Sequence, residues 1–315
     1  MSPPKVLVDA PPFPLDLVSD LLAPTGALVE ARPRPWSGDG VVGLLVWEAI
    51  SAADLERLPD LKVVATCSVG FDHIDVAAAA RRGVWVCNVP DYCIEEMADS
   101  TIALLLALLR GVVALDRTVR SGAWDDHAAG PLSRLSGTRL GVVGFGRIGR
   151  AVAGRALALG MEVWAFDPIV DAPDLAAARV KPATLEELLA SCTAITLHVP
   201  LTPQTTRFIG DRELALMPRG AFLVNTARSG LVDGEALLAA LDSGQLGGAA
   251  VDVLDVEPPT AEHPAPRHPR LIVTPHAAWY SPDSEREVYR RATLAVRAVI
   301  EGRQPDGAVA RPSAR

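Results

Sequence analysis

The sequence has few of the features that would indicate a disulfide-bonded, metal-dependent or membrane-embedded protein. Its four cysteines, Cys67, Cys87, Cys93 and Cys192, show no C-x-x-C spacing, so we expect neither disulfides nor a metal site. No apolar run approaches the roughly 18 residues that span a bilayer. The N-terminal residues lack the charged segment, apolar segment and cleavage site of a signal peptide, which predicts a cytoplasmic protein.

Clustered positive charge is also missing. The net charge is -8 and the pI is about 5.3, and no basic stripe is sustained, so nucleic acid is a poor candidate partner. Hydrophobic residues make up 49% and charged residues 22%, as in a soluble globular enzyme. At 315 residues the chain exceeds the usual size of a single core, which predicts two domains.

The most informative stretch, residues 138–167, places a G-x-G-x-x-G motif between a strand candidate and a helix candidate. Its glycines are Gly144, Gly146 and Gly149. The first permits a tight turn, the second lets backbone approach a pyrophosphate at the helix N-terminus, and the third lets the helix pack on the strand. Asp167 follows, where a carboxylate would bind a ribose diol and repel a 2′-phosphate. The motif predicts NAD binding; a βαβ unit that binds no nucleotide is the alternative.

Before this motif, short apolar runs alternate with helical segments. The strand candidates are KVLVD, GALVE, VVGLLVW, KVVATCS and VWVCNV, and the helix candidates are residues 15–22, 52–58 and 76–82. They predict a small α/β domain with a mostly parallel sheet. In the segment 67–75, either backbone N–H groups bind a substrate carboxylate or Asp75 merely caps the next helix, and the sequence leaves both open.

Residues 94–119 form the longest helix candidate, apolar over most of its surface, which predicts a helix buried between domains. After Asp167 the alternation resumes with the strand candidates AITLHV, AFLVNT, GAAVDVL and LIVTPH. With the strands of the motif they make six or seven parallel strands, a doubly wound sheet whose ligands bind at the carboxyl ends. A final helix, residues 282–301, is long enough to return to the first domain, and a short Pro/Gly/Arg tail follows it.

Three ionisable residues, Arg228, Glu257 and His276, fall at or just after late strands. His276 can exchange a proton near neutral pH, Glu257 could hydrogen-bond its imidazole and raise its proton affinity, and Arg228 could hold a carboxylate. Each alone has an ordinary structural explanation, but together they suit hydride transfer, in which the protein moves one proton. A hydrolase is disfavoured because no G-x-S-x-G elbow follows a strand.

The chain resembles the D-isomer-specific 2-hydroxyacid dehydrogenases over about residues 5–301. The resemblance rests on CSVGFDHID, CNVPDYCIEEMADST, GAFLVNTARSGLVD and TPHAAWYS, and it is closest to the branch of the C-terminal binding protein corepressors. It implies that His276 is the acid/base, Glu257 its partner, and Arg228 the anchor of the substrate carboxylate and carbonyl.

The resemblance also implies the remaining site residues. The expected cofactor contacts are Val69, Thr101, Gly144, Phe145, Gly146, Arg147, Ile148, Asp167, His198, Val199, Pro200, Thr205, Thr226, Ala227, Arg228, Asp252, His276, Ala278 and Trp279. The expected substrate contacts are Trp47, Ser68, Val69, Gly70, Arg228, His276 and Trp279.

The family's layout implies two Rossmann-like doubly wound domains with a cleft between them. The substrate domain would comprise residues 1–98 and 283–315, the NAD domain residues 99–282, and the protein would form a homodimer through the NAD domain and the helix near residues 94–119. Three departures from the family pattern stand out. Ser229 replaces a glycine common after the arginine, Trp47-Glu48 occupy a variable substrate-facing loop, and Trp279 resembles the aromatic residue of the corepressor branch.

The sequence therefore predicts an NAD-dependent oxidoreductase that interconverts a 2-keto acid and a D-2-hydroxy acid. Two alternatives stay open: an NAD-sensing, corepressor-like protein that binds a peptide, and a phosphite-type dehydrogenase on the same scaffold. No direct nucleic-acid partner and no membrane are expected.

Overall fold

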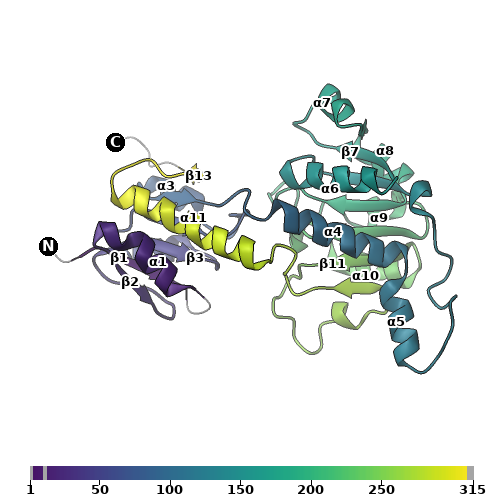
Figure 1. Ribbon diagram of the computed structural model, residues 1–315, viewed down its shortest axis with the longest axis horizontal. Coiled ribbons are helices and arrows are strands. Elements are labelled where there is room, and N and C mark those ends of the chain that lie inside the picture. The colour runs from purple at the N-terminus through teal and green to yellow at the C-terminus, as the bar shows by residue number, and fades with distance from the viewer. Residues whose placement is uncertain (1–2, 10–12, 311–315) are drawn as a thin grey trace. The chain divides into compact units, whose positions relative to one another are not determined.

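The computed structural model describes residues 3–9 and 13–310. The chain divides into two compact units, which Figure 1 shows coloured along the sequence. Unit 1 comprises Met1–Tyr92 and Ser281–Arg315, and unit 2 comprises Cys93–Tyr280. Unit 1 is thus discontinuous, with boundaries at 92/93 and 280/281, whereas 98/99 and 282/283 were expected for the domains.

Unit 1 is built on a six-stranded sheet in the order β13-β5-β4-β3-β1-β2. Its strands are β1 (Lys5–Val8), β2 (Leu28–Ala31), β3 (Val41–Val46), β4 (Val63–Thr66), β5 (Trp85–Cys87) and β13 (Ala308–Ala310). Neighbours are parallel except for β13, which pairs antiparallel with β5. The expectation that the C-terminal segment is only a tail was wrong for Ala308–Ala310, because this strand is specified by its distant partner β5 and not by its own sequence.

Helices cover both faces of this sheet. The helices α1 (Leu15–Leu22) and α11 (Pro282–Ile300) pack on one face, side by side in Figure 1, and α2 (Ala52–Glu56) and α3 (Val76–Arg81) pack on the other. Successive side chains of β1 alternate between the two cores: Val6 and Val8 join α11, and Leu7 joins the opposite core. Both faces are apolar, as in parallel sheets covered on two sides.

Unit 2 contains a seven-stranded, fully parallel sheet in the order β12-β11-β10-β9-β6-β7-β8. Its strands are β6 (Arg139–Val143), β7 (Glu162–Phe166), β8 (Lys181–Pro182), β9 (Ala194–Leu197), β10 (Ala221–Asn225), β11 (Leu246–Val251) and β12 (Leu271–Val273). This confirms the predicted doubly wound sheet.

The helices of unit 2 also form two layers. The core of one face includes α4 (Ile94–Leu109), α6 (Arg147–Ala158) and α7 (Ala172–Ala177). The core of the other includes α8 (Leu185–Ser191), α9 (Asp211–Leu216) and α10 (Gly234–Asp242). Figure 1 shows α4 and α6 lying against each other, and this pair packs on β6 and β10.

The expected single helix over residues 94–119 is wrong, because two helices form instead. Gly111 has φ 61°, a left-handed conformation, and ends α4 before α5 (Val112–Arg120) begins. Whereas α4 buries a row of leucines, no residue of α5 is fully buried. Among the described residues no single helix is long and apolar enough to cross a membrane, although α4 and α5 together, bent by 61°, pass that test of length and composition.

Candidate active site

All seven strands of the unit 2 sheet are parallel, so their carboxyl ends lie along one edge. Predicted site residues follow these ends in the order of the sheet; from β12 to β7 they are His276, Asp252, Arg228, His198, Gly144 and Asp167. The chain order reverses between β9 and β6, and open α/β sheets bind ligands at such a switch point. The predicted residues of unit 2 therefore border the expected ligand site.

The glycine loop between β6 and α6 has the shape that its motif predicts. Gly144 has φ 95°, and a Cβ there would lie 2.7 Å from the carbonyl carbon of His198. A Cβ at Gly149 would lie 2.1 Å from the Gly144 oxygen, whereas a Cβ at Gly146 would meet no atom within 4 Å. Helix α6 begins at Arg147 without a side-chain cap, which leaves its first N–H groups for an anion. The loop therefore fits the pyrophosphate of a dinucleotide.

Three backbone N–H groups hold the carboxylate of Asp167 at the end of β7. Oδ2 accepts a hydrogen bond from Phe145 N at 2.7 Å, and Oδ1 accepts from Ile169 N at 2.8 Å and from Val170 N at 3.2 Å. A cavity of about 390 Å³ borders Asp167. Each carboxylate oxygen has two lone pairs, so acceptor capacity remains for a ribose diol. The carboxylate thus fits the predicted NAD site while it joins two loops.

His198 follows β9, next to the glycine loop. Its Nε2 lies 3.0 Å from the hydroxyl of Thr196, and burial lowers the pKa of His198 to about 4. The imidazole is therefore neutral at physiological pH.

Two buried threonines join α4 to the carboxyl edge of the sheet. The hydroxyls of Thr101 and Thr226 lie 2.8 Å apart, and Thr101 also donates to Met97 O at 2.7 Å. Both were predicted to contact the cofactor, and the structure brings them together.

Asn225, at the end of β10, was not predicted from the sequence. Its Nδ2 donates to Arg228 O at 2.8 Å, and its Oδ1 accepts from Ala227 N at 3.0 Å. Asn225 is buried, and it fixes the backbone that carries Arg228. The sequence signal that could have identified Asn225 is its position as a polar residue at the end of an otherwise apolar strand.

His276 and Glu257 lie together beyond β11 and β12. His276 Nδ1 is 2.7 Å from Glu257 Oε2, and Glu257 Oε1 accepts from Leu254 N at 2.7 Å. A cavity of about 420 Å³ borders both side chains. The carboxylate fixes one ring nitrogen of His276 as the donor, and the partly exposed ring leaves Nε2 for another group.

Asp252 is the hub of the loop that carries His276. Its buried carboxylate accepts from Ala277 N at 3.0 Å, from Ala278 N at 2.8 Å and from the hydroxyl of Thr274, and its carbonyl accepts from His276 N at 2.8 Å. His276 has φ 52°, a conformation that is strained for a non-glycine residue. The hydrogen bonds of Asp252 hold the loop in this conformation. A direct contact between Asp252 and the cofactor stays a prediction.

Of the remaining predicted residues of unit 2, Arg147 and Ile148 begin α6, and the others lie in loops at the same edge. Trp279 Nε1 donates to His276 O at 2.9 Å, and Ser100 on α4, which was not predicted, donates to Ala278 O at 3.0 Å. Thr205 Oγ1 donates to Pro200 O at 2.7 Å, which closes the turn that follows Val199.

Trp47, Ser68, Val69 and Gly70 belong to unit 1. The loop after β4 is braced by hydrogen bonds from Ser68 Oγ to Gly70 O and from Asn88 Nδ2 to Val69 O, both 2.6 Å. Within the described residues, neither Val69 N nor Gly70 N donates a hydrogen bond, so both amides are available to an anion. Asp75 Oδ1 accepts from Ala78 N at 2.8 Å, which confirms the helix cap. Binding of an anion by these backbone N–H groups and capping of the next helix by Asp75 are therefore compatible.

Comparisons with known proteins agree with this architecture. Residues 102–278 match the family model of the D-isomer specific 2-hydroxyacid dehydrogenase, NAD binding domain. A glycerate dehydrogenase of Methylorubrum extorquens is 39% identical over 80% of each chain, and a glyoxylate reductase of Korarchaeum cryptofilum is 40% identical over 84% of this chain and 80% of its own. The structure is similar to that of an Aquifex aeolicus D-lactate dehydrogenase complexed with NAD and lactic acid, with a TM-score of 0.84, 28% identity, and coverage of 94% of this chain and 96% of the other.

These matches concern the family as a whole, and the resemblance to the corepressor branch stays a prediction. The glycine loop, the acid after β7 and the parallel sheet fit the NAD that the matched domain binds. The chain belongs to the D-isomer-specific 2-hydroxyacid dehydrogenases, a family of NAD-dependent oxidoreductases.

Proposed function

We propose that the protein reduces a short 2-keto acid to the D-2-hydroxy acid with NADH, and catalyses the reverse oxidation with NAD. The observation that carries the proposal is the His276–Glu257 pair, a proton donor held by a carboxylate at the carboxyl edge of a dinucleotide-binding sheet. Hydride chemistry on a carbonyl requires one proton at the carbonyl oxygen, and this pair supplies it.

His276 delivers that proton through Nε2, because Nδ1 is hydrogen-bonded to Glu257. In reduction the imidazolium donates to the oxygen at C2, and its charge is stabilised by the Glu257 carboxylate. In oxidation the neutral ring takes the proton from the hydroxyl. NADH, when bound, supplies the hydride to C2.

Arg228 orients the substrate. Its guanidinium offers donors in a planar fork, which suits a carboxylate next to a carbonyl oxygen, and its positive charge polarises that carbonyl. The side-chain amide of Asn225 holds the backbone here: its Nδ2 donates to Arg228 O and its Oδ1 accepts from Ala227 N. In unit 1, the Val69 and Gly70 N–H groups are the donors that the family resemblance implies for a substrate carboxylate.

The substrate class that we propose is a 2-keto acid with a small substituent, such as glyoxylate or hydroxypyruvate. The support is the names of two relatives, a glycerate dehydrogenase and a glyoxylate reductase, which are 39% and 40% identical to this chain.

The test is an assay of the purified protein with NADH and, in parallel, NADPH against glyoxylate, hydroxypyruvate, pyruvate and a bulky 2-keto acid, followed by loss of the reduced-nicotinamide absorbance. We expect turnover of the small keto acids with NADH. NAD binding without turnover of any keto acid would contradict the proposal, and a parallel arm with phosphite and NAD tests the phosphite-type alternative.

We also propose a homodimer that buries apolar side chains of α5 and the segment after it. Val112 and Val119 are about half exposed, and Trp124 is 92% exposed. Light scattering on the purified protein distinguishes the dimer from a monomer.

A further inference from the structure

The sheet of unit 1 has its own switch point. From β1 the chain passes to β2 on one side and then to β3 on the other, so the strand order reverses between β1 and β3. Ligands of open α/β sheets bind at the carboxyl ends of the strands beside such a reversal. At these two ends lie Asp9, directly after β1, and the segment 47–49, directly after β3.

The side chain of Asp9 binds the backbone of this segment. Its Oδ2 accepts a hydrogen bond from Trp47 N at 2.8 Å and a longer one from Glu48 N at 3.4 Å. Its Oδ1 accepts from Arg34 Nε at 2.8 Å. Asp9 is buried, 8% exposed, so these groups take the place of water around its charge.

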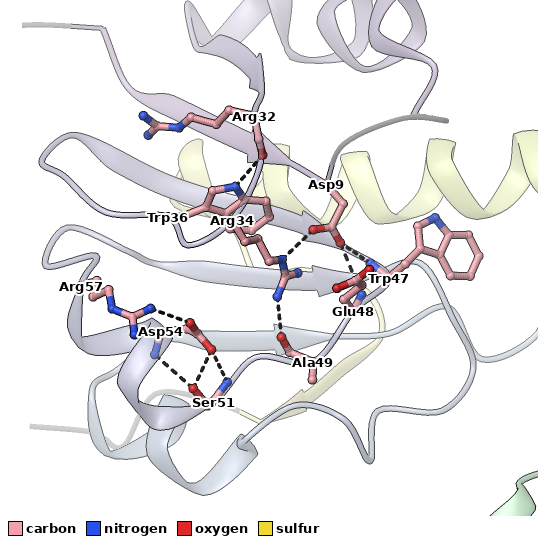
Figure 2. A network of polar contacts seen from close by, with 10 residues as sticks. All are labelled: Asp9, Arg32, Arg34, Trp36, Trp47, Glu48, Ala49, Ser51, Asp54 and Arg57. Atoms are coloured by element: carbon pink, nitrogen blue, oxygen red, sulfur yellow. Dashed lines mark hydrogen bonds and ion pairs between the residues drawn. The ribbon is translucent and has the colours of Figure 1, made fainter. Parts of the chain in front are cut away.

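Arg34 holds the same segment from the other side. Its Nη1 donates to Ala49 O, and its guanidinium carbon lies 4.5 Å from the centroid of the Trp36 ring. Trp36 is itself fixed by a hydrogen bond from Nε1 to Arg32 O at 2.8 Å. Figure 2 shows Asp9 and Arg34 between the two strand ends, joined to Trp47, Glu48 and Ala49 by dashed lines.

Three consecutive residues are thus clamped by one ion pair. Two N–H groups point to Asp9 and one carbonyl to Arg34, so the pair fixes the path of the backbone over residues 47–49. Removing either partner would leave the other charge without its counterpart in a partly buried place, and the segment would lose an anchor.

The clamped segment adjoins the predicted carboxylate loop. Cys67 N donates to Val46 O at 2.8 Å, so residues 47–49 continue beside residues 68–70 at the same edge. The Trp47 ring packs edge-on against Tyr289 of α11, with centroids 6.1 Å apart and Nε1 3.3 Å from the phenol oxygen. Glu48 is exposed at this edge.

We propose that Asp9 and Arg34 are positioning residues for substrate binding: they hold residues 47–49 in the conformation in which Trp47 and Glu48 face the keto acid. The inference rests on the proposed function for the identity of the ligand. Neither residue touches the substrate, so the pair sets the affinity for the keto acid and leaves the NADH site in unit 2 unchanged.

The test compares Asp9→Asn, Arg34→Met and the double variant with the wild type. We expect each single variant to raise the KM for the keto acid about 10-fold, because small displacements of a positioning group are costly. The KM for NADH and the kcat at saturating keto acid should stay within about two-fold, a change that lies near the ordinary scatter of independent sites. The double variant should be no worse than the poorer single variant, since both act through one segment.

The matched control is Arg57→Met, which removes another arginine–aspartate pair of unit 1, Arg57 Nη1 to Asp54 Oδ1 at 2.9 Å. Among the residues drawn in Figure 2, no hydrogen bond or ion pair joins this pair to residues 47–49, and its loss should leave the KM for the keto acid unchanged. If Arg34→Met folds poorly, Arg34→Lys takes its place, because lysine keeps the positive charge with a single donor group. Its KM for the keto acid should lie between those of the wild type and Asp9→Asn.

Hydrogen exchange gives a readout that does not depend on activity. The amides of Trp47 and Glu48 should exchange faster in Asp9→Asn than in wild type or Arg57→Met. Unchanged exchange would show that the clamp does not hold the segment. Faster exchange with an unchanged KM for the keto acid would show that the segment does not control substrate affinity. Either result overturns the inference, whereas a wild type without any keto-acid turnover overturns the proposed function and leaves the exchange test standing.

Discussion

His276 Nδ1 lies 2.7 Å from Glu257 Oε2, and the other oxygen of that carboxylate is fixed by the backbone N–H of Leu254. The ring is therefore oriented by a group that is itself oriented. His276→Gln should lower kcat about 100- to 10,000-fold, the usual contribution of a positioned acid/base. Steady-state kinetics measure the loss of kcat. Fluorescence titration measures the affinity for NADH, which should change far less than kcat.

A second histidine–carboxylate pair gives the control for this variant. His263 Nε2 lies 2.9 Å from Asp255 Oδ1, in the loop before β12. His263→Gln should keep nearly full activity. Equal losses in both variants would show that His276 acts only through the stability of the loop.

Glu257→Gln tests the charge of the partner. Glutamine preserves the shape and can still accept from Leu254 N, but it no longer stabilises an imidazolium. We expect kcat/KM for keto-acid reduction to fall about 10- to 100-fold, the scale of one lost charge-assisted hydrogen bond. A wild-type value measured in the variant would exclude the carboxylate from the proton transfer.

Arg228→Lys tests whether the fork geometry matters. Lysine keeps the positive charge but has no planar pair of donors, so the KM for the keto acid should rise and kcat should fall, together about 100-fold in kcat/KM. The exposed Arg207, whose Nη1 lies 3.5 Å from Asp233, provides the control Arg207→Lys. Full activity of Arg228→Lys would reduce the role of Arg228 to its charge alone.

Asp167→Asn tests the cofactor preference. The amide can retain part of the bonding to Phe145, Ile169 and Val170, while the negative charge that repels a 2′-phosphate is lost. We expect the ratio of kcat/KM for NADH to that for NADPH to fall at least about 10-fold, the effect of one charge contact. Asp174→Asn, on the exposed side of α7, should leave the ratio unchanged. An unaltered ratio in Asp167→Asn would assign the cofactor preference to other residues.

The fold of unit 2 could be predicted because its strands are short apolar runs separated by helical spacing, and the glycine motif supplied the start. What was missed depends on local breaks and distant partners. Gly111 splits a helix whose apolar pattern continues on both sides, and β13 forms only through its pairing with β5. Neither feature follows from the periodicity of its own segment.

The chemistry of the candidate site could also be predicted only in part. His276, Glu257 and Arg228 were visible because chemically distinct residues end successive strands. Asn225 was not predicted, because its role consists of hydrogen bonds to backbone groups. The Asp9–Arg34 clamp joins residues 25 positions apart, and only the register of β1 against β2 and β3 brings them together.

The stability of the protein should depend on the protonation of His198. Burial lowers its pKa to about 4 from an ordinary 6.5, so at intermediate pH the unfolded chain binds a proton that the folded protein does not. Stability is therefore lost as pH falls below about 6.5, and the loss is complete below about 4. Between about pH 7 and about pH 5 the linkage amounts to about 2 kcal/mol of the free energy of unfolding.

Urea unfolding of the wild type and of His198→Gln at these two pH values measures this contribution. Glutamine can still hydrogen-bond the Thr196 hydroxyl, but it does not titrate, so the variant should lose about 2 kcal/mol less than the wild type on acidification. Because every other titrating group is shared, the difference between the two proteins isolates His198. Equal losses would mean that the imidazole takes up its proton in the folded state near its ordinary pKa, and hence that the ring is better solvated than its position after β9 implies.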